Sequence, residues 1–165
     1  MDNFANRLRI GHGVDVHAFT YDRKLIIGGV DIPYSRGLAG HSDADVLSHA
    51  VADALLGALR AGDIGKLFPE DDPRYSGANS LLLLAEVGRL VLSFGYRIID
   101  IDTVVMAQEP KLAPYRDAMR KNIAQALGIE EESVGVKATT TEHLGFIGRE
   151  EGILAEATCL LCRCQ

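Results

Sequence analysis

Asp15 and His17 form the first pair of residues in the chain that has the chemistry of a metal site. They stand in residues 8–17, where apolar and polar residues alternate. This alternation predicts a strand on which second neighbours share a face. His49, on a predicted helix, supplies a second imidazole. Two imidazoles and one carboxylate suit tetrahedral zinc with an open fourth position, as in catalytic zinc sites. The alternatives are a solvent-facing strand end and a solvated helix face, since Asp45, His49 and Asp53 form a polar stripe at every fourth residue of the helix.

His41 and Ser42 stand where the helix that carries His49 is predicted to begin. A helix N-terminus offers unpaired N–H groups and the positive end of the helix dipole, and both favour an anion such as phosphate. Ser42 and Asp45 also match the pattern of a capping box, so capping alone explains part of this segment.

A third polar group follows a predicted strand that ends near residue 139. Thr139, Thr140 and Thr141 offer three hydroxyls, and Arg149 lies a short turn further on. These groups can donate hydrogen bonds to phosphate, and Glu142 offers the carboxylate that a hard cation such as Mg²⁺ prefers. Threonines are also ordinary strand residues, which is the simpler interpretation of the run.

Three cysteines, Cys159, Cys162 and Cys164, lie close together near the end of the chain. Their number is odd and their spacing is too short for a disulfide framework. A zinc site would need a fourth ligand, so we interpret them as reduced and structurally incidental. This usage favours a reducing, cytoplasmic location.

Composition excludes several classes of protein. The chain has 165 residues, 47% of them hydrophobic, and a net charge of −6. We expect a flexible tail at 1–7, one domain at 8–162 and a second tail at 163–165. The sequence shows neither the apolar run of about 18 residues that a membrane span needs nor the layout of a signal peptide. The negative charge argues against nucleic acid or membrane partners, so a phosphate-rich substrate would need local charges or metals.

The predicted elements alternate in the order β-β-α-α-β-α-β-β. Strands are expected at 8–17, 24–32, 96–107, 134–139 and 153–161, and helices near 42–62, 80–94 and 114–128. This order indicates an α+β fold in which a single mixed sheet carries helices on one face. The other face, which carries Val14 and Val16, would be uncovered, so a symmetric oligomer is expected.

Taken together, the motifs resemble the 2-C-methyl-D-erythritol 2,4-cyclodiphosphate synthase family of the non-mevalonate isoprenoid pathway. The segments that carry the resemblance read RIGHGVDVH at 9–17, HSDAD at 41–45, DIGKLFP at 63–69, KATTTE at 137–142 and LGF with GREEGI at 144–153. The Asp-x-His pair alone is weak evidence, but the full ordered set is highly specific.

The resemblance implies a cyclic homotrimer with the sheets facing the axis and three active sites between subunits. It implies one zinc ion per subunit on Asp15, His17 and His49, and a second ion, Mg²⁺ or Mn²⁺, on Glu142. His41 and Thr140 match positions that stabilise the transition state in the family.

The resemblance also implies which residues bind the substrate, a cytidine diphosphate ester. The erythritol and β-phosphate side would use Ser42, Asp63, Ile64, Gly65, Phe68, Pro69, Glu70, Asp71 and Asp72. The cytidine side, from the neighbouring subunit, would use Ala107, Gln108, Glu109, Pro110, Lys111, Leu112, Ala113, Thr139 and Thr141. Phe146 and Arg149 match further ligand-binding positions near the trimer axis, as does Glu156, where an isoprenoid diphosphate could bind.

The implied reaction converts 4-diphosphocytidyl-2-C-methyl-D-erythritol 2-phosphate to the 2,4-cyclodiphosphate and CMP. The 2-phosphate would attack the β-phosphorus with the assistance of the two metal ions. Two alternatives stay open at this point. One is a zinc-dependent phosphate-ester hydrolase, and the other is a trimeric metal-binding or ligand-binding protein without catalysis.

Overall fold

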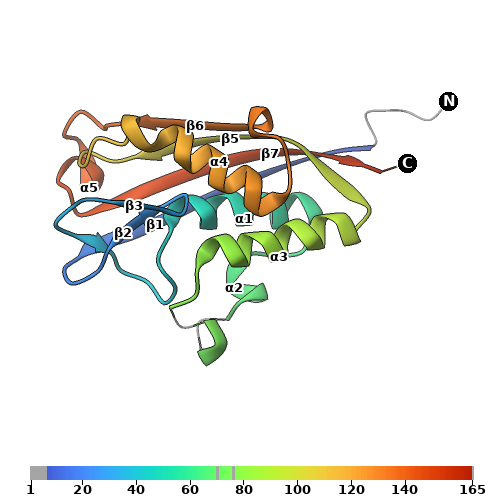
Figure 1. Ribbon diagram of the computed structural model, residues 1–165, viewed down its shortest axis with the longest axis horizontal. Coiled ribbons are helices and arrows are strands. Elements are labelled where there is room, and N and C mark those ends of the chain that lie inside the picture. Colours follow the sequence, from blue (N-terminus) through green and yellow to red (C-terminus); the bar gives the residue numbers. More distant parts are fainter. Residues whose placement is uncertain (1–6, 70, 76, 165) are drawn as a thin grey trace.

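Strand β1 (Leu8–Thr20) lies near the middle of a five-stranded sheet in the computed structural model, which describes residues 7–69, 71–75 and 77–164 (Figure 1). The strand order is β4-β1-β7-β5-β6. β7 (Gly152–Arg163) pairs antiparallel with both β1 and β5 (Tyr96–Met106), and β5 pairs parallel with β6 (Val134–Thr139). The short β4 (Gly37–Leu38) pairs with the end of β1. The mixed sheet that was expected is confirmed, but it is not the single sheet of the chain.

Residues 24–32 do not form the single strand that was predicted. They form a separate two-stranded sheet of β2 (Leu25–Ile27) and β3 (Val30–Ile32). Gly28 and Gly29 join the strands with φ angles of +56° and +68°. Two successive residues with positive φ make the tight turn of a hairpin, and glycine adopts this conformation without steric cost.

Three long helices lie on one face of the sheet, as predicted: α1 (Val46–Leu59), α3 (Ser80–Ser93) and α4 (Arg116–Leu127). The structure adds the short helices α2 (Ile64–Leu67) and α5 (Gly145–Gly148) and 3₁₀ turns at Pro73–Tyr75, Ala113–Tyr115 and Glu131–Ser133. The predicted order of elements therefore lacked β4, the hairpin, α2 and α5. Among the described residues, no helix combines the length and the apolar composition needed to cross a membrane.

Helix α1 packs directly on the backbone of β1. A Cβ atom at Gly11 would lie 1.8 Å from the Ala54 carbonyl oxygen, and one at Gly13 would lie 2.2 Å from the Ala50 carbonyl oxygen. Only glycine permits this approach. Asp15 and His17 share the face of Gly11 and Gly13, so the close contact brings α1 within reach of both side chains.

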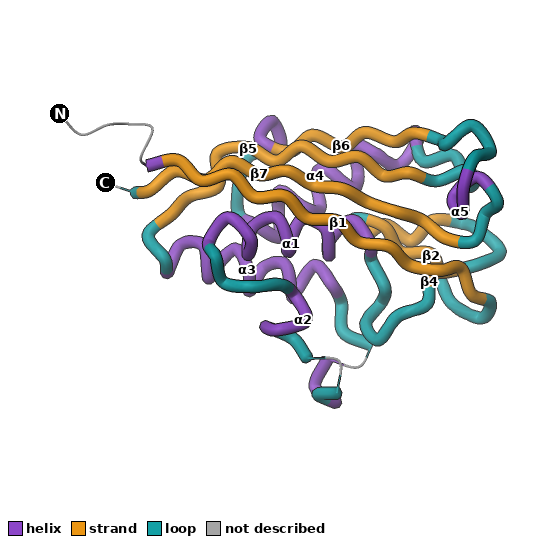
Figure 2. The backbone as a smooth tube through the Cα atoms, turned by 180° about the vertical axis from the view of Figure 1, so that it is seen from behind, coloured by secondary structure: helices purple, strands orange, loops and turns teal. Residues whose placement is uncertain are grey.

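The opposite face of the sheet carries exposed apolar side chains. Ile10, Val14 and Val16 of β1 are 67%, 44% and 47% exposed. Figure 2 views β1, β7 and β5 from this side, with α4 behind them. Apolar side chains exposed together on one sheet face are typical of a surface that a partner covers.

Candidate metal centre and substrate site

Asp15, His17 and His49 converge, as the sequence predicted. The Nε2 atom of His17 lies 2.9 Å from Oδ2 of Asp15, and the Nδ1 atom of His49 lies 3.1 Å from the same oxygen. The two ring nitrogens are 3.2 Å apart. Ligand atoms around a tetrahedral zinc ion, with bonds of about 2.0–2.1 Å, stand about 3.3 Å apart. The three donor atoms therefore fit a zinc ion in both type and spacing.

The second ring nitrogen of each histidine also has a hydrogen-bond partner. His17 donates through Nδ1 to the Ala39 carbonyl oxygen at 2.6 Å, which leaves Nε2 for the metal. His49 Nε2 lies 2.9 Å from Ser80 Oγ and 3.2 Å from Ser42 Oγ, which leaves Nδ1 for the metal. Partners of this kind orient metal-binding imidazoles and fix their tautomers.

The charges in the triad favour a cation beside Asp15. Burial acts to raise the pKa of the Asp15 carboxyl, but hydrogen bonds and charge from His17 and His49 outweigh it and hold the pKa well below its ordinary value. Burial acts to lower the pKa of His17, but the interactions with Asp15 and the Ala39 carbonyl outweigh it, so this pKa is raised. The pair therefore attracts positive charge, which a proton or a metal ion can supply.

A cavity of about 140 Å³, here called the triad hollow, lies against the three ligands. It brings together five of the residues predicted to bind substrate or stabilise the transition state: His41, Ser42, Ile64, Gly65 and Phe68. Its remaining wall consists of Tyr75 and Leu83, which the sequence analysis did not identify. Tyr75 packs edge-on against Phe68, with ring centroids 5.2 Å apart. In the sequence, Tyr75 is an aromatic residue in a polar loop rich in Gly, Pro and Asp, and this feature could have indicated a role for it.

Two aspartates hold the turn at Ile64 and Gly65. Asp53 accepts a hydrogen bond from the Ile64 N–H at 2.7 Å, and Asp63 caps α2 by accepting from the Lys66 N–H at 2.9 Å. Asp63 therefore supports the wall of the triad hollow and is not among its lining residues. Asp53, which the sequence analysis placed on a polar helix face, has the same supporting function.

Asp45, the first residue of the polar stripe predicted on α1, does not lie on a solvated helix face. Asp45 is fully buried and is the N-cap of α1, and its carboxylate accepts from the N–H groups of Gly28, Gly29 and Ser48. Its side chain therefore ties the start of the helix to the hairpin. Ser42 does not cap this helix, because its hydroxyl faces His49 instead.

The loop after Phe68 was predicted to bind substrate, but its described residues up to Asp72 do not line the triad hollow. Pro69, Asp71 and Asp72 are not among its lining residues, and Asp72 forms an ion pair with Arg74 at 2.5 Å. Glu70 lies outside the described residues. The binding role predicted for this loop stays a prediction.

The residues predicted for the cytidine side gather elsewhere. Ala107, Pro110, Lys111, Leu112, Ala113, Thr139 and Thr140 line a cavity of about 160 Å³, here called the threonine hollow. In the described part of the chain it shares no lining residue with the triad hollow. One chain therefore carries two separate groups of candidate site residues.

Other predicted residues of this group lie beside the threonine hollow. Glu142 is exposed, and its carboxylate accepts from the Thr140 hydroxyl at 2.9 Å. Gln108 is buried and accepts from the His143 N–H at 3.1 Å, so it braces the loop that carries Glu142. Thr141 donates to the Leu144 carbonyl at 2.7 Å, and Glu109 forms an ion pair with Lys111 at 3.5 Å.

Phe146 and Arg149 belong to neither hollow among the described residues. Phe146 lies in α5, and Arg149 follows it and donates through Nε to Glu151 at 2.7 Å. The ligand role that was predicted for them stays a prediction.

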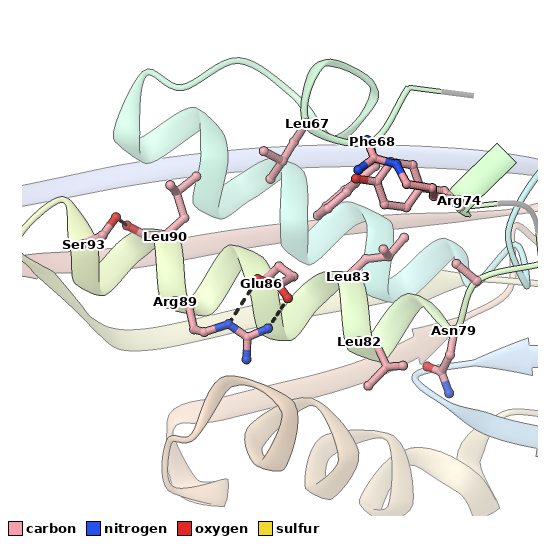
Figure 3. Close-up of a pocket in the computed structure, with 12 residues that line it drawn as sticks. Leu67, Phe68, Arg74, Asn79, Leu82, Leu83, Glu86, Arg89, Leu90 and Ser93 are labelled. Carbon is pink, nitrogen blue, oxygen red and sulfur yellow. Dashed lines mark hydrogen bonds and ion pairs between the residues drawn. The ribbon is translucent and has the colours of Figure 1, made fainter. Parts of the chain in front are cut away.

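A larger cavity of about 780 Å³, here called the helix hollow, lies between α3 and the loop above it (Figure 3). Phe68, Tyr75 and Leu83 form the wall that it shares with the triad hollow. Its other described lining residues are three leucines, Ala78 and the polar residues Arg74, Asn79, Glu86, Arg89 and Ser93. The charged group of Arg89 is paired with Glu86 (Figure 3). The helix hollow is larger than the triad hollow, but among the described residues it contains no group of three potential metal ligands.

Comparison with known proteins agrees with this geometry. The model of the YgbB family matches residues 8–162. The 2-C-methyl-D-erythritol 2,4-cyclodiphosphate synthase of Moorella thermoacetica is 63% identical over 93% of this chain and 94% of its own length. A Plasmodium falciparum IspF complex with CDP has a TM-score of 0.85 at 36% identity, over 97% of this chain and 99% of that chain. The bifunctional IspDF of Campylobacter jejuni has a TM-score of 0.91 at 46% identity, over 94% of this chain and 42% of that longer chain.

Proposed function

The chain belongs to the YgbB family of 2-C-methyl-D-erythritol 2,4-cyclodiphosphate synthases, and we propose that it converts 4-diphosphocytidyl-2-C-methyl-D-erythritol 2-phosphate to the cyclodiphosphate and CMP. The observation that carries this proposal is the triad of Asp15, His17 and His49 at the wall of a hollow that also contains His41 and Ser42. A zinc-dependent hydrolase is not supported, because the matched relatives are synthases.

The bond changes of the reaction need no strong base. An oxygen of the 2-phosphate forms a bond to the β-phosphorus, and the bond from that phosphorus to the oxygen bridging the α- and β-phosphates breaks. CMP leaves with the bridging oxygen. A phosphate monoester has a second pKa of about 6, so the attacking oxygen is already anionic at neutral pH. The chain therefore has to orient two anionic groups and reduce their repulsion.

The residues of the triad hollow orient the erythritol and β-phosphate side. Asp15, His17 and His49 would hold zinc, Glu142 would hold Mg²⁺ or Mn²⁺, and the two ions would supply positive charge that offsets the repulsion between the phosphates. His41 and Thr140 offer hydrogen-bond donors where negative charge increases in the transition state. Phe68 and Tyr75, which pack against each other, would form an apolar wall beside the erythritol.

We further propose that the complete site forms between subunits of a homotrimer. The triad hollow and the threonine hollow are separate in one chain, and the sheet face with Val14 and Val16 is exposed. A cyclic trimer would cover that face and bring the triad hollow of one subunit against the threonine hollow of the next. Val14 lies opposite Glu156 on β7, so both would lie near the axis, where the isoprenoid diphosphate of the resemblance would bind.

One experiment separates the synthase from a hydrolase and from a protein that only binds ligands. The protein is incubated with the 2-phosphate substrate and Mg²⁺ in ¹⁸O-labelled water. A synthase releases CMP and the cyclic product in equal amounts with no label in either. Hydrolysis would instead place one ¹⁸O atom in one of the two products, the erythritol phosphate if water attacks the β-phosphorus or CMP if water attacks the α-phosphorus. The absence of CMP would leave only binding.

A further inference from the structure

The imidazole of His49 leads into a chain of hydrogen bonds that the proposed reaction does not use. His49 Nε2 lies 2.9 Å from Ser80 Oγ. The Ser80 hydroxyl bonds Oδ1 of Asp43, and the Ser80 N–H donates to Oδ2 of the same carboxylate at 3.0 Å. Ser80 is the first residue of α3 and is 1% exposed, and Asp43 is half-buried. Water therefore has little access to this chain of contacts.

The chemistry of these groups fixes the direction of each bond. An ionised carboxylate only accepts hydrogen bonds, so the Ser80 hydroxyl donates its single proton to Asp43. The Ser80 oxygen can then only accept from His49, which places the imidazole proton on Nε2. The lone pair on Nδ1 then faces Asp15 Oδ2 at 3.1 Å and His17 Nε2 at 3.2 Å.

We propose that Asp43 and Ser80 are positioning residues of the metal centre, which hold His49 in the tautomer that binds zinc through Nδ1. The inference rests on the metal centre of the proposed function and assigns a role to two residues outside the triad. Partners of this kind change metal affinity by about 10–100-fold when they are removed.

Ser42 does not replace Ser80 in this role. Its hydroxyl lies 3.2 Å from the same nitrogen and accepts from the Ala44 N–H at 3.1 Å. Its own proton can rotate toward His49, so Ser42 fits either tautomer of the ring. Of the two hydroxyls, that of Ser80 alone donates to a carboxylate in the described part of the chain.

Backbone hydrogen bonds beside Asp43 and Ser80 also hold the substrate side of the site in place. The Asp43 N–H donates to the Ala78 carbonyl at 3.1 Å, and the Gly77 N–H donates to the His41 carbonyl at 2.9 Å. The segment that begins α3 is therefore bonded to the segment that carries His41 and Ser42. Asp43 and Ser80 therefore connect the metal ligand His49 to helix α3 and to the segment 41–42.

The test compares Ser80→Ala with Ser48→Ala. Ser48 is equally buried and its hydroxyl donates to a carboxylate, Asp45 at 2.7 Å, so its loss imitates the cost to folding without touching His49. Zinc affinity is measured on the full-length protein by competition with a chromophoric chelator. Ser80→Ala should lower the affinity about 10–100-fold, and Ser48→Ala should leave it within about twofold. Equal affinities in wild type and Ser80→Ala would overturn the proposal.

A second measurement covers the case in which Ser80→Ala does not fold. Asp43→Asn removes the charge that orients the Ser80 hydroxyl and should weaken zinc binding. In zinc-loaded protein, ¹⁵N NMR of His49 should show zinc on Nδ1 and the proton on Nε2 in wild type, and a mixture of the two arrangements in Asp43→Asn. An unchanged tautomer and unchanged affinity would overturn the proposal. Normal zinc affinities in a wild-type protein that releases no CMP would instead contradict the proposed function alone.

Discussion

The metal triad and the segment Thr139–Glu142 are both small polar groups, but only the triad brings its proposed metal ligands together within one chain. Asp15, His17 and His49 point their donor atoms at one another, and the second nitrogen of each ring has a partner. Glu142 is exposed and has its contact with its own neighbour Thr140. The difference fits the proposed function, in which zinc would bind to a single subunit and the second metal and the nucleotide would also need the neighbouring subunit.

The largest effect is expected from His49→Ala. The variant should lose bound zinc and roughly a thousandfold or more in turnover, because several kcal/mol of charge stabilisation disappear with the ion. His49 faces the triad and not the core, so the fold should persist. Metal analysis and circular dichroism check both points. Full zinc content in the folded variant would contradict the assignment of this ligand.

Glu142→Gln should separate the two regions. The amide has nearly the shape of the carboxylate but not its charge, so the variant should keep zinc and lose its dependence on Mg²⁺ or Mn²⁺, with turnover reduced about a hundredfold. A titration of activity with Mg²⁺ measures the loss. Gln108 lies next to this loop but binds it through a backbone N–H, so the fold of the loop should be retained. A wild-type Mg²⁺ titration curve would exclude Glu142 as the ligand.

Acid should weaken the triad more than the Glu142 side. Zinc binds neutral imidazole, and Asp15 raises the pKa of His17, so protons begin to compete at a higher pH than for a free histidine. Zinc affinity should therefore fall as pH falls through this raised pKa, by about tenfold per pH unit once below it. Chelator competition between pH 8 and pH 5.5 measures the slope. A flat profile would show that His17 is not a ligand.

The smallest expected change in activity gives the most direct test of whether the two regions meet between subunits. Asp15→Ala damages the triad and Glu142→Ala damages the other region, so each variant alone should be inactive. When equal amounts are unfolded, mixed and refolded, roughly a quarter of the interfaces should join an intact triad to an intact Glu142, and activity should approach that fraction of wild type. Native mass spectrometry must show mixed trimers. If mixed trimers form and no activity returns, each site lies within one subunit.

The sequence was sufficient for the triad and the long elements, for physical reasons that the structure makes clear. Alternation along residues 8–17 placed Asp15 and His17 on one face, and helical spacing identified α1, α3 and α4. The helices α2 and α5 have four residues each, too few to show a period. The strands of the hairpin have three residues each, too few to be distinguished in the sequence, so 24–32 was predicted as one strand.

The residues that support the site were the harder part to predict. Asp45 was expected on a polar helix face, but it is buried as a cap because the hairpin supplies N–H donors from a distant segment. Ser80 begins the predicted helix 80–94, but Asn79 is the N-cap of that helix, and the Ser80 hydroxyl faces His49. These roles depend on contacts between segments that are 16 to 31 residues apart, and periodicity within one segment cannot show them.

The contact between α1 and the glycines of β1 determines where this chain tolerates genetic variation. Gly11 and Gly13 carry no functional group, yet any side chain there would meet the backbone of α1 at less than 3 Å. Such a substitution would push His49 away from Asp15 and abolish metal binding without altering a ligand. A saturation screen for loss of function would therefore identify these two glycines as strongly as the metal ligands. The glycine variants would fail because the metal site is displaced, although every ligand is still present.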